Sequence, residues 1–349
     1  MKRTNPMLDL IRLARPLNLL IMALTMALIR YGLVMGYLER GLKQLLREVG
    51  GGITRAQISV EPGFGPQLPL GLFVLLVLSV VLIGAAGNII NDYFDTRIDR
   101  INRPSTVIVG RSVKRRVAMA AHLVLSSAGL LCGAIVAWRT GQWPLLVIPA
   151  FAIGALWTYS TSFKRQLIIG NGTVAALTAL VPLTVGLYEI PALQRSFVAH
   201  GTVTLPGEAR YEMEGSFTEL WWWVLGFAAF AFLSSLVREL QKDMADVKGD
   251  AAHGCRTVPI AWGMRWAKAL TLAYVALLIL ALLAVHMLVP ALRGNMAYWY
   301  IQLGVIAPLL LSAAFTYNAA TREEHNRAGA LMKVAMVMGA GFAALIRFL

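Results

Sequence analysis

The chain has 349 residues, of which 58% are apolar and only 14% are charged, and its net charge is +14. An average soluble domain carries roughly 25% charged residues, so this composition excludes an ordinary soluble enzyme, a disordered chain and a coiled coil. The basic residues are scattered between apolar stretches instead of forming one patch, which favours a membrane protein and argues against a nucleic-acid partner.

Nine apolar stretches are long enough for a helix to cross a bilayer, which takes about 20 residues. They occupy roughly 17–38, 69–90, 117–138, 143–159, 168–188, 220–238, 266–289, 297–318 and 330–349. Helices are expected because a helix satisfies its own backbone hydrogen bonds in lipid. The fourth stretch is short, which leaves eight spans as the alternative. The sequence therefore predicts an all-α polytopic membrane protein with about nine transmembrane helices in a single domain, 1–349.

The distribution of basic residues predicts the orientation. With the N-terminus in the cytoplasm, the cytoplasmic segments carry 22 Lys and Arg residues, and the opposite side carries 8. Membrane proteins keep most of their positive charge on the cytoplasmic side. We therefore expect an integral protein of the cell membrane with its N-terminus inside and, after nine spans, its C-terminus outside. Two long outer loops are expected at about 39–68 and 189–219.

Seven of the 18 acidic residues fall in two short windows, and each window follows an apolar stretch on the predicted cytoplasmic side. Aspartates recur there at positions i, i+3 and i+7: Asp92, Asp95 and Asp99 in the first window, and Asp243, Asp246 and Asp250 in the second. On a helix this spacing places three carboxylates on one face. Asn88 extends the first face by one turn, and Glu239 extends the second.

Three carboxylates on one face repel each other, and they do so more strongly where water is scarce. Mg²⁺ suits such a site, because it binds one or two carboxylates together with substrate phosphates and water. No His or Cys lies in register with the acids, which disfavours zinc. Either window alone is as typical of a solvated helix end, but the matched pair favours a metal site. Basic residues beside the acids suit phosphate oxygens: Arg97, Arg103, Arg111, Lys164, Arg238 and Lys242.

The two windows also resemble the paired aspartate-rich motifs of the UbiA superfamily of intramembrane prenyltransferases. The matching segments are Asn91-Asp92-Tyr93-Phe94-Asp95 with Asp99 and Asn102-Arg103-Pro104, then Asp243 to Asp250 with Arg256-Thr257-Val258-Pro259. Arg15-Pro16 with Asn18, and Lys164-Arg165 with Gly170-Asn171, resemble further parts of the family. The resemblance implies nine helices around a central cavity, with both motifs on the cytoplasmic side. It also implies Mg²⁺-dependent transfer of a polyprenyl group from its diphosphate to a lipophilic acceptor.

The resemblance further implies a role for each residue that matches. The expected catalytic carboxylates are Asp92, Asp95, Asp243 and Asp246. The expected metal ligands are these four with Asn88, Asp99 and Asp250. The expected diphosphate-binding residues are Asn18, Arg103, Lys164 and Lys242. Tyr159 is expected to face the allylic cation, where its ring stabilises positive charge, or else to be an interfacial tyrosine.

The acceptor is the least determined part of the reaction. The segment Ile101–Pro104 and the stretch from Arg238 to Pro259 most resemble the lipid-forming branch, whose acceptor is geranylgeranylglyceryl phosphate. The segment from Val107 to Arg111 departs from the usual Pro-Ser-Gly sequence, so aromatic acceptors of quinone, chlorophyll or haem type stay open. A cation-coupled transporter and a membrane scaffold are the alternatives of other classes. Transporters typically carry their acids near the bilayer midplane, whereas here the acids gather at one side.

Overall fold

The computed structural model describes residues 6–49, 59–61, 63–198, 202–204, 210–212 and 217–348. Within these ranges, nine helices are long and apolar enough to cross a membrane. The predicted all-α polytopic fold is therefore confirmed, and the short fourth stretch is present as a span of 19 residues. The nine spans are Pro16–Arg47, Leu70–Asn102, Arg115–Arg139, Trp143–Thr161, Ile169–Phe197, Thr218–Ala252, Met264–Leu288, Asn295–Asn318 and Arg322–Ile346.

Several spans combine two or three consecutive helical segments. The long helices are α2 (Pro16–Leu28), α3 (Met35–Val49), α4 (Leu70–Asn102), α5 (Arg115–Arg139), α6 (Val147–Thr161), α7 (Ile169–Leu193), α8 (Thr218–Ala252), α10 (Met264–Leu288), α12 (Ala307–Asn318) and α13 (Arg322–Ile346). Short helices are α1 (Pro6–Leu13), α9 (Val258–Ala261) and α11 (Asn295–Trp299). The π-helical and 3₁₀ segments are η1 (Ile29–Val34), η3 (Trp143–Leu146), η4 (Phe163–Arg165), η5 (Gln194–Val198), η6 (Pro290–Leu292) and η7 (Tyr300–Ile306).

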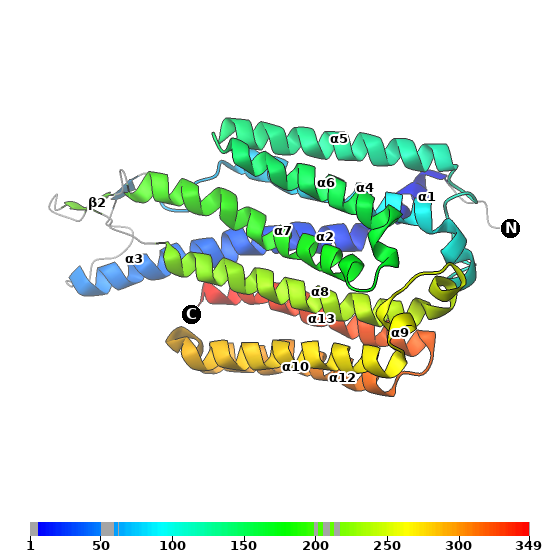
Figure 1. Ribbon diagram of the computed structural model, residues 1–349. Helices are drawn as coiled ribbons and strands as arrows, with labels where there is room; N and C mark the ends of the chain where they lie inside the picture. The colour runs from blue at the N-terminus through cyan, green and yellow to red at the C-terminus, as the bar shows by residue number, and fades with distance from the viewer. Residues whose placement is uncertain are drawn as a thin grey trace.

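The long helices run side by side along one axis, so the protein is an elongated bundle (Figure 1). Helix α1, where the described residues begin, lies at one end of the bundle, and the last turn of α13 lies at the other, as an odd number of crossings requires. Helices α4 and α5 pack together, as do α7 and α8, and α13 packs against both α8 and α12. Helix α8 therefore lies between α7 and α13, and it also contacts α4 and α10.

Two helices extend well beyond the apolar stretches that predict them. Helix α4 continues to Asn102 and α8 continues to Ala252, so both aspartate windows are helical throughout. The segment 39–68 begins as helix, since α3 runs to Val49. The two long loops also contribute a small antiparallel sheet that the sequence does not predict. Its strands, in the order β1-β2-β3, are Ser59–Glu61, Thr202–Thr204 and Arg210–Glu212.

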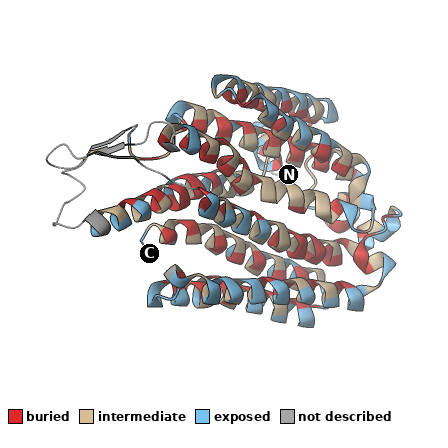
Figure 2. Ribbon diagram, turned by 60° about the vertical axis from the view of Figure 1, so that its left-hand side comes forward, coloured by how far each residue is buried: buried red, intermediate tan, exposed pale blue. Residues whose placement is uncertain are grey.

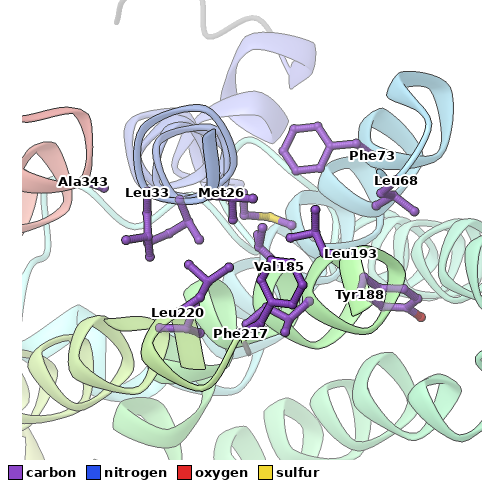
Figure 3. Close-up of a cluster of buried hydrophobic side chains, with 14 of the residues drawn as sticks. Met26, Leu33, Leu68, Phe73, Val185, Tyr188, Leu193, Phe217, Leu220 and Ala343 are labelled. Carbon is purple, nitrogen blue, oxygen red and sulfur yellow. The ribbon is translucent and has the colours of Figure 1, made fainter. Parts of the chain in front are cut away.

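The largest cluster of buried apolar side chains lies between α2, η1, α7, α8 and α13. Figure 3 shows Met26 and Leu33 facing Val185 and Leu220, and all four are nearly inaccessible. Buried residues lie on the inner faces of the helices, and exposed residues lie on the outer faces (Figure 2). Many of the exposed side chains are large and apolar, as expected of a surface in contact with lipid.

A buried ion pair lies next to this apolar cluster. Arg30, in the first span, is 4% exposed, and Glu189 of α7 is fully buried. The guanidinium Nη1 lies 3.7 Å from Glu189 Oε2, and Arg30 also donates a hydrogen bond to the carbonyl of Leu68. The guanidinium carbon lies 4.5 Å from the centre of the Phe73 ring. These contacts neutralise a charge that would otherwise be costly within a membrane span.

Candidate active site

The two aspartate windows come together at the end of the bundle where α4 and α8 terminate. All six aspartates line one cavity of about 210 Å³: Asp92, Asp95, Asp99, Asp243, Asp246 and Asp250. Helical periodicity places each triplet on one face, and the packing of α4 against α8 turns both faces toward the same space. We call this space the aspartate cavity.

The first triplet is paired with basic side chains from two other parts of the chain. Arg15 Nη2 donates to Asp92 Oδ1 at 2.6 Å, and Lys164 Nζ donates to Asp95 Oδ1. The side chain of Asp99 makes no hydrogen bond or ion pair with any residue that the structure describes, although its backbone carbonyl accepts a hydrogen bond from the Arg103 N–H. The Lys164 contact joins the connector between α6 and α7 to the first window, as expected of a basic residue beside this site.

The second triplet is held by an amide and two guanidinium groups. Asn171 Nδ2 donates to Asp243 Oδ2 at 2.9 Å. Arg103 Nη2 donates to one oxygen of Asp246 at 2.7 Å, and Arg322 Nη2 donates to the other at 3.2 Å. Asn171 belongs to a segment that resembles the family, so the sequence indicates its place at this site. No pattern in the sequence around Arg322 predicts that it lies here.

The donor atoms at the aspartate cavity suit a hard divalent cation. Six carboxylates line it, and the Oδ1 atom of Asn91, on the same wall, is buried without a hydrogen-bond partner. Among the described residues, no three His, Cys, Asp or Glu side chains converge closely enough to hold a metal ion. Four of the carboxylates are engaged by Arg, Lys and Asn side chains instead. The oxygen-rich donor set fits Mg²⁺, provided that some of these contacts open.

Two predicted site residues lie outside the aspartate cavity. Asn88 Nδ2 donates to the backbone oxygen of Ala14 at 2.9 Å, so this amide connects α4 to the turn before α2. Asn88 and Asn18 line a second, larger cavity of about 290 Å³. Asn91, one turn further along α4 than Asn88, lines both cavities. The periodicity of the first window extends to Asn88, but the side chain of Asn88 meets the turn before α2 and not the aspartates of α8.

The second cavity is mostly lined by apolar side chains, and we call it the apolar cavity. It begins at the aspartate end of the bundle. It reaches Leu76, near the N-terminal end of α4, and Tyr188, near the C-terminal end of α7. Four residues line both cavities: Arg15, Asn91, Tyr159 and Lys242. Tyr159 is 9% exposed, and its position at this junction is inside the protein and not at a lipid interface.

Two arginines and a cysteine at the aspartate cavity lie outside the spans, and their protonation states follow from their surroundings. Burial lowers the pKa of Arg15 and Arg103, but the facing carboxylates Asp92 and Asp246 outweigh it, so both pKa values are raised. Burial raises the pKa of Cys255, and the charge of Asp250 adds to this effect. The cavity therefore carries permanently charged guanidinium groups and a neutral thiol at pH 7.

Arg15 also has an unusual backbone conformation. Its φ is 56°, the left-handed region that residues other than glycine seldom adopt. It occupies the turn between α1 and α2, directly before Pro16. Its ion pair with Asp92 holds the side chain toward the aspartate cavity, so that the turn, and not a helix face, positions this guanidinium.

Comparison with known proteins agrees with this geometry. The sequence profile of the UbiA prenyltransferase family matches residues 63–337. The chain is 32% identical, over 83% of its length and 88% of that protein, to a digeranylgeranylglyceryl phosphate synthase of Thermococcus kodakarensis. Its fold is similar to an apo UbiA homologue from Aeropyrum pernix, with a TM-score of 0.60, 17% identity and coverage of 94% and 98% of the two chains. It is also similar to a UbiA homologue from Archaeoglobus fulgidus bound to DMAPP and Mg²⁺, with a TM-score of 0.56, 16% identity and coverage of 97% and 99%.

Proposed function

The chain belongs to the UbiA prenyltransferase family, and from this premise we propose that it transfers a geranylgeranyl group from its diphosphate to geranylgeranylglyceryl phosphate in a Mg²⁺-dependent reaction. The name of the Thermococcus kodakarensis relative supports this acceptor, and the Archaeoglobus fulgidus homologue bound to DMAPP and Mg²⁺ supports the metal. One feature of the protein carries the proposal: a carboxylate-lined cavity opens at Tyr159 into a long apolar one.

We assign the diphosphate of the prenyl donor to the aspartate cavity. The six aspartates would hold Mg²⁺, and the bound ion would offset the negative charge that develops on the departing diphosphate. Lys164 and Arg103, which also line this cavity, would contact phosphate oxygens once their carboxylate partners turn to the metal. Lys242 lies at the junction, where it faces the end of the diphosphate that is joined to the prenyl group.

We assign the prenyl chain to the apolar cavity, with its allylic carbon beside Tyr159. Apolar walls keep water away from the developing allylic cation, which water would otherwise capture. The tyrosine ring stabilises that positive charge through its π electrons. The acceptor hydroxyl forms a C–O bond to the allylic carbon as the bond from that carbon to diphosphate breaks. The products are an ether, diphosphate and a proton.

We also propose that the aspartate end of the bundle faces the cytoplasm. The excess of basic residues in the segments on that side supports this orientation. It places the N-terminus inside and the C-terminus outside, and it gives water-soluble Mg²⁺ and released diphosphate direct access to the cytoplasm.

Purified protein in nanodiscs tests the reaction with radiolabelled geranylgeranyl diphosphate and a panel of acceptors. We expect Mg²⁺-dependent ether formation with geranylgeranylglyceryl phosphate, and loss of turnover in Asp95→Asn and Asp243→Asn. Glu323→Gln, an exposed acid at the start of α13, is the control that should keep full activity. Transfer only to hydroxybenzoate-type aromatics would overturn the acceptor, and full activity of both aspartate variants would overturn the metal site.

A further inference from the structure

The wall of the apolar cavity carries more positive than negative charge. Four of its lining residues are basic and one is acidic: Arg15, Arg238, Lys242 and Lys333 against Glu239. Glu239 is 2% exposed and accepts hydrogen bonds from Arg238 at 2.6 Å and from Lys242 at 3.4 Å. Arg15 is engaged by Asp92 of the aspartate cavity. The single carboxylate of Glu239 is thus shared by Arg238 and Lys242, and the lining of the apolar cavity keeps a net positive charge.

Lys333 is the cation without a counter-ion. It lies on α13, is half-buried, and makes no hydrogen bond or ion pair with any residue that the structure describes. The positive charges of Arg238 and Arg15 repel its ammonium group, and the carboxylate of Glu239 attracts it. The Nε atom of Arg238 is also buried without a hydrogen-bond partner. A charged amine in a largely apolar cavity of a membrane span is costly unless an anion binds there.

Lys333 and Arg238 lie apart from the site that we assign to the diphosphate. Lys333 and Arg238 line the apolar cavity but not the aspartate cavity, whereas Lys164 and Arg103 line the aspartate cavity alone. Tyr159 and Lys242 lie at the junction between the two sets. An anion at Lys333 would consequently be a second anion, close to the place where the allylic carbon meets its acceptor.

From this placement we propose that Lys333 and Arg238 bind the phosphate monoester of the lipid acceptor and so select a phosphorylated acceptor over a neutral one. The inference rests on the proposed function, whose acceptor carries such a group. A guanidinium and an ammonium together suit a phosphate, the first by its paired donors and the second as a point charge. An acceptor held there has its lipid chain in apolar surroundings and its glycerol hydroxyl near the junction.

Steady-state kinetics on Lys333→Met test the proposal, because methionine keeps the length of the side chain and removes its charge. We expect KM for geranylgeranylglyceryl phosphate to rise about tenfold or more, since a hydrogen bond to a charged group is lost. KM for geranylgeranyl diphosphate should stay unchanged, and Lys333→Arg should restore most of the loss. Lys248→Met removes an exposed charge from α8 and should leave both KM values as they are.

The same experiment shows whether these cations bind the phosphate of the acceptor or the diphosphate of the prenyl donor. If Lys333→Met raises KM for the prenyl diphosphate and not for the acceptor, these cations bind the donor and the proposal is wrong. The unphosphorylated acceptor geranylgeranylglycerol provides a further arm. Its turnover, however slow, should be equal in wild type and Lys333→Met, because it has no phosphate to lose contact with.

A binding measurement without turnover keeps the inference distinct from the proposed function. Thermal unfolding is followed in detergent with EDTA, so that the diphosphate site lacks its metal. Geranylgeranylglyceryl phosphate should raise the Tm of wild type more than geranylgeranylglycerol does, and this difference should vanish in Lys333→Met. Equal shifts with both lipids would overturn the phosphate site, whatever the acceptor of the reaction proves to be. A phosphate-dependent shift without ether formation would retain the site and reject the proposed function.

Discussion

Asn102 and Gly249 join the ends of the two helices that carry the aspartates. Asn102 Oδ1 accepts a hydrogen bond from the Gly249 N–H at 2.8 Å, and its Nδ2 donates to the carbonyl of Asp246 at 3.1 Å. A Cβ atom on Gly249 would lie 2.5 Å from Asn102 Nδ2. The last turn of α4 therefore rests directly on the backbone of α8, and this contact determines how far apart the two aspartate triplets lie.

Gly249→Ala should separate the two triplets. Asn102 is 7% exposed, so it can make room for a methyl group only by losing both hydrogen bonds, and such overpacking costs about 1–3 kcal/mol. We expect kcat to fall about tenfold or more while the protein still inserts in the membrane and unfolds at a slightly lower Tm. Gly226→Ala is the control, because a Cβ atom added at this position on α8 would meet no atom within 4 Å beyond its own turn of the helix. Unchanged turnover in Gly249→Ala would show that the site tolerates a different spacing.

Substitutions of Tyr159 distinguish its ring from its hydroxyl group. If the ring stabilises the allylic cation, Tyr159→Phe should keep turnover within about threefold, and Tyr159→Leu should lose about tenfold, equivalent to a typical cation–π contribution. The measurement is kcat with geranylgeranyl diphosphate at saturating acceptor. Tyr317→Leu, an exposed tyrosine on α12, controls for the loss of an aromatic side chain. A phenylalanine variant as slow as the leucine variant would assign the role to the hydroxyl instead.

Sequence periodicity is sufficient to predict the faces of the aspartate helices but not what each face meets. The i, i+3, i+7 spacing is a local property of the chain, and all six aspartates do share one cavity. Asn88 continues the same face, yet its amide donates to the carbonyl of Ala14, in the turn before α2, and it lines the apolar cavity. Asn91 lies between these two environments and lines both cavities.

Long-range pairs are the part of the fold that the sequence could not predict. Arg30 and Arg347 are visible in the sequence as charges within spans, but their partners Glu189 and Glu39 lie on other helices. Hydropathy identifies which residues enter the membrane, whereas pairing depends on how the helices rotate and pack. The same limit applies to Arg322, which is distant in sequence from both windows and yet binds Asp246.

The depth of the apolar cavity predicts which prenyl chains fit. Val80 lines it on α4, eleven residues before Asn91, which corresponds to about 16 Å along the helix. Val80→Phe should block the distal part, so that kcat/KM for geranylgeranyl diphosphate falls about tenfold relative to that for geranyl diphosphate. Leu78→Phe adds similar bulk on the exposed side of the same helix and should leave this ratio unchanged. An unaltered ratio in Val80→Phe would place the prenyl chain elsewhere.

Cys255 offers a probe of the aspartate cavity that does not depend on turnover. The thiol lies in the connector after α8, lines the cavity and is 4% exposed. Burial raises its pKa, and the neighbouring carboxylate Asp250 adds to this effect. The reactive form of a cysteine is the thiolate, so a raised pKa slows its alkylation at neutral pH.

In a Cys132→Ser background, maleimide should therefore label Cys255 much more slowly at pH 7 than it labels an exposed thiol. The rate should rise about tenfold between pH 7 and pH 8, because the thiolate fraction does so below the pKa. Mg²⁺ together with an uncleavable prenyl diphosphate analogue should then protect Cys255, because both would occupy the cavity that it lines. EDTA should abolish this protection, since the diphosphate is held through the metal. Protection that persists in EDTA would mean that the aspartates are not needed to bind the diphosphate.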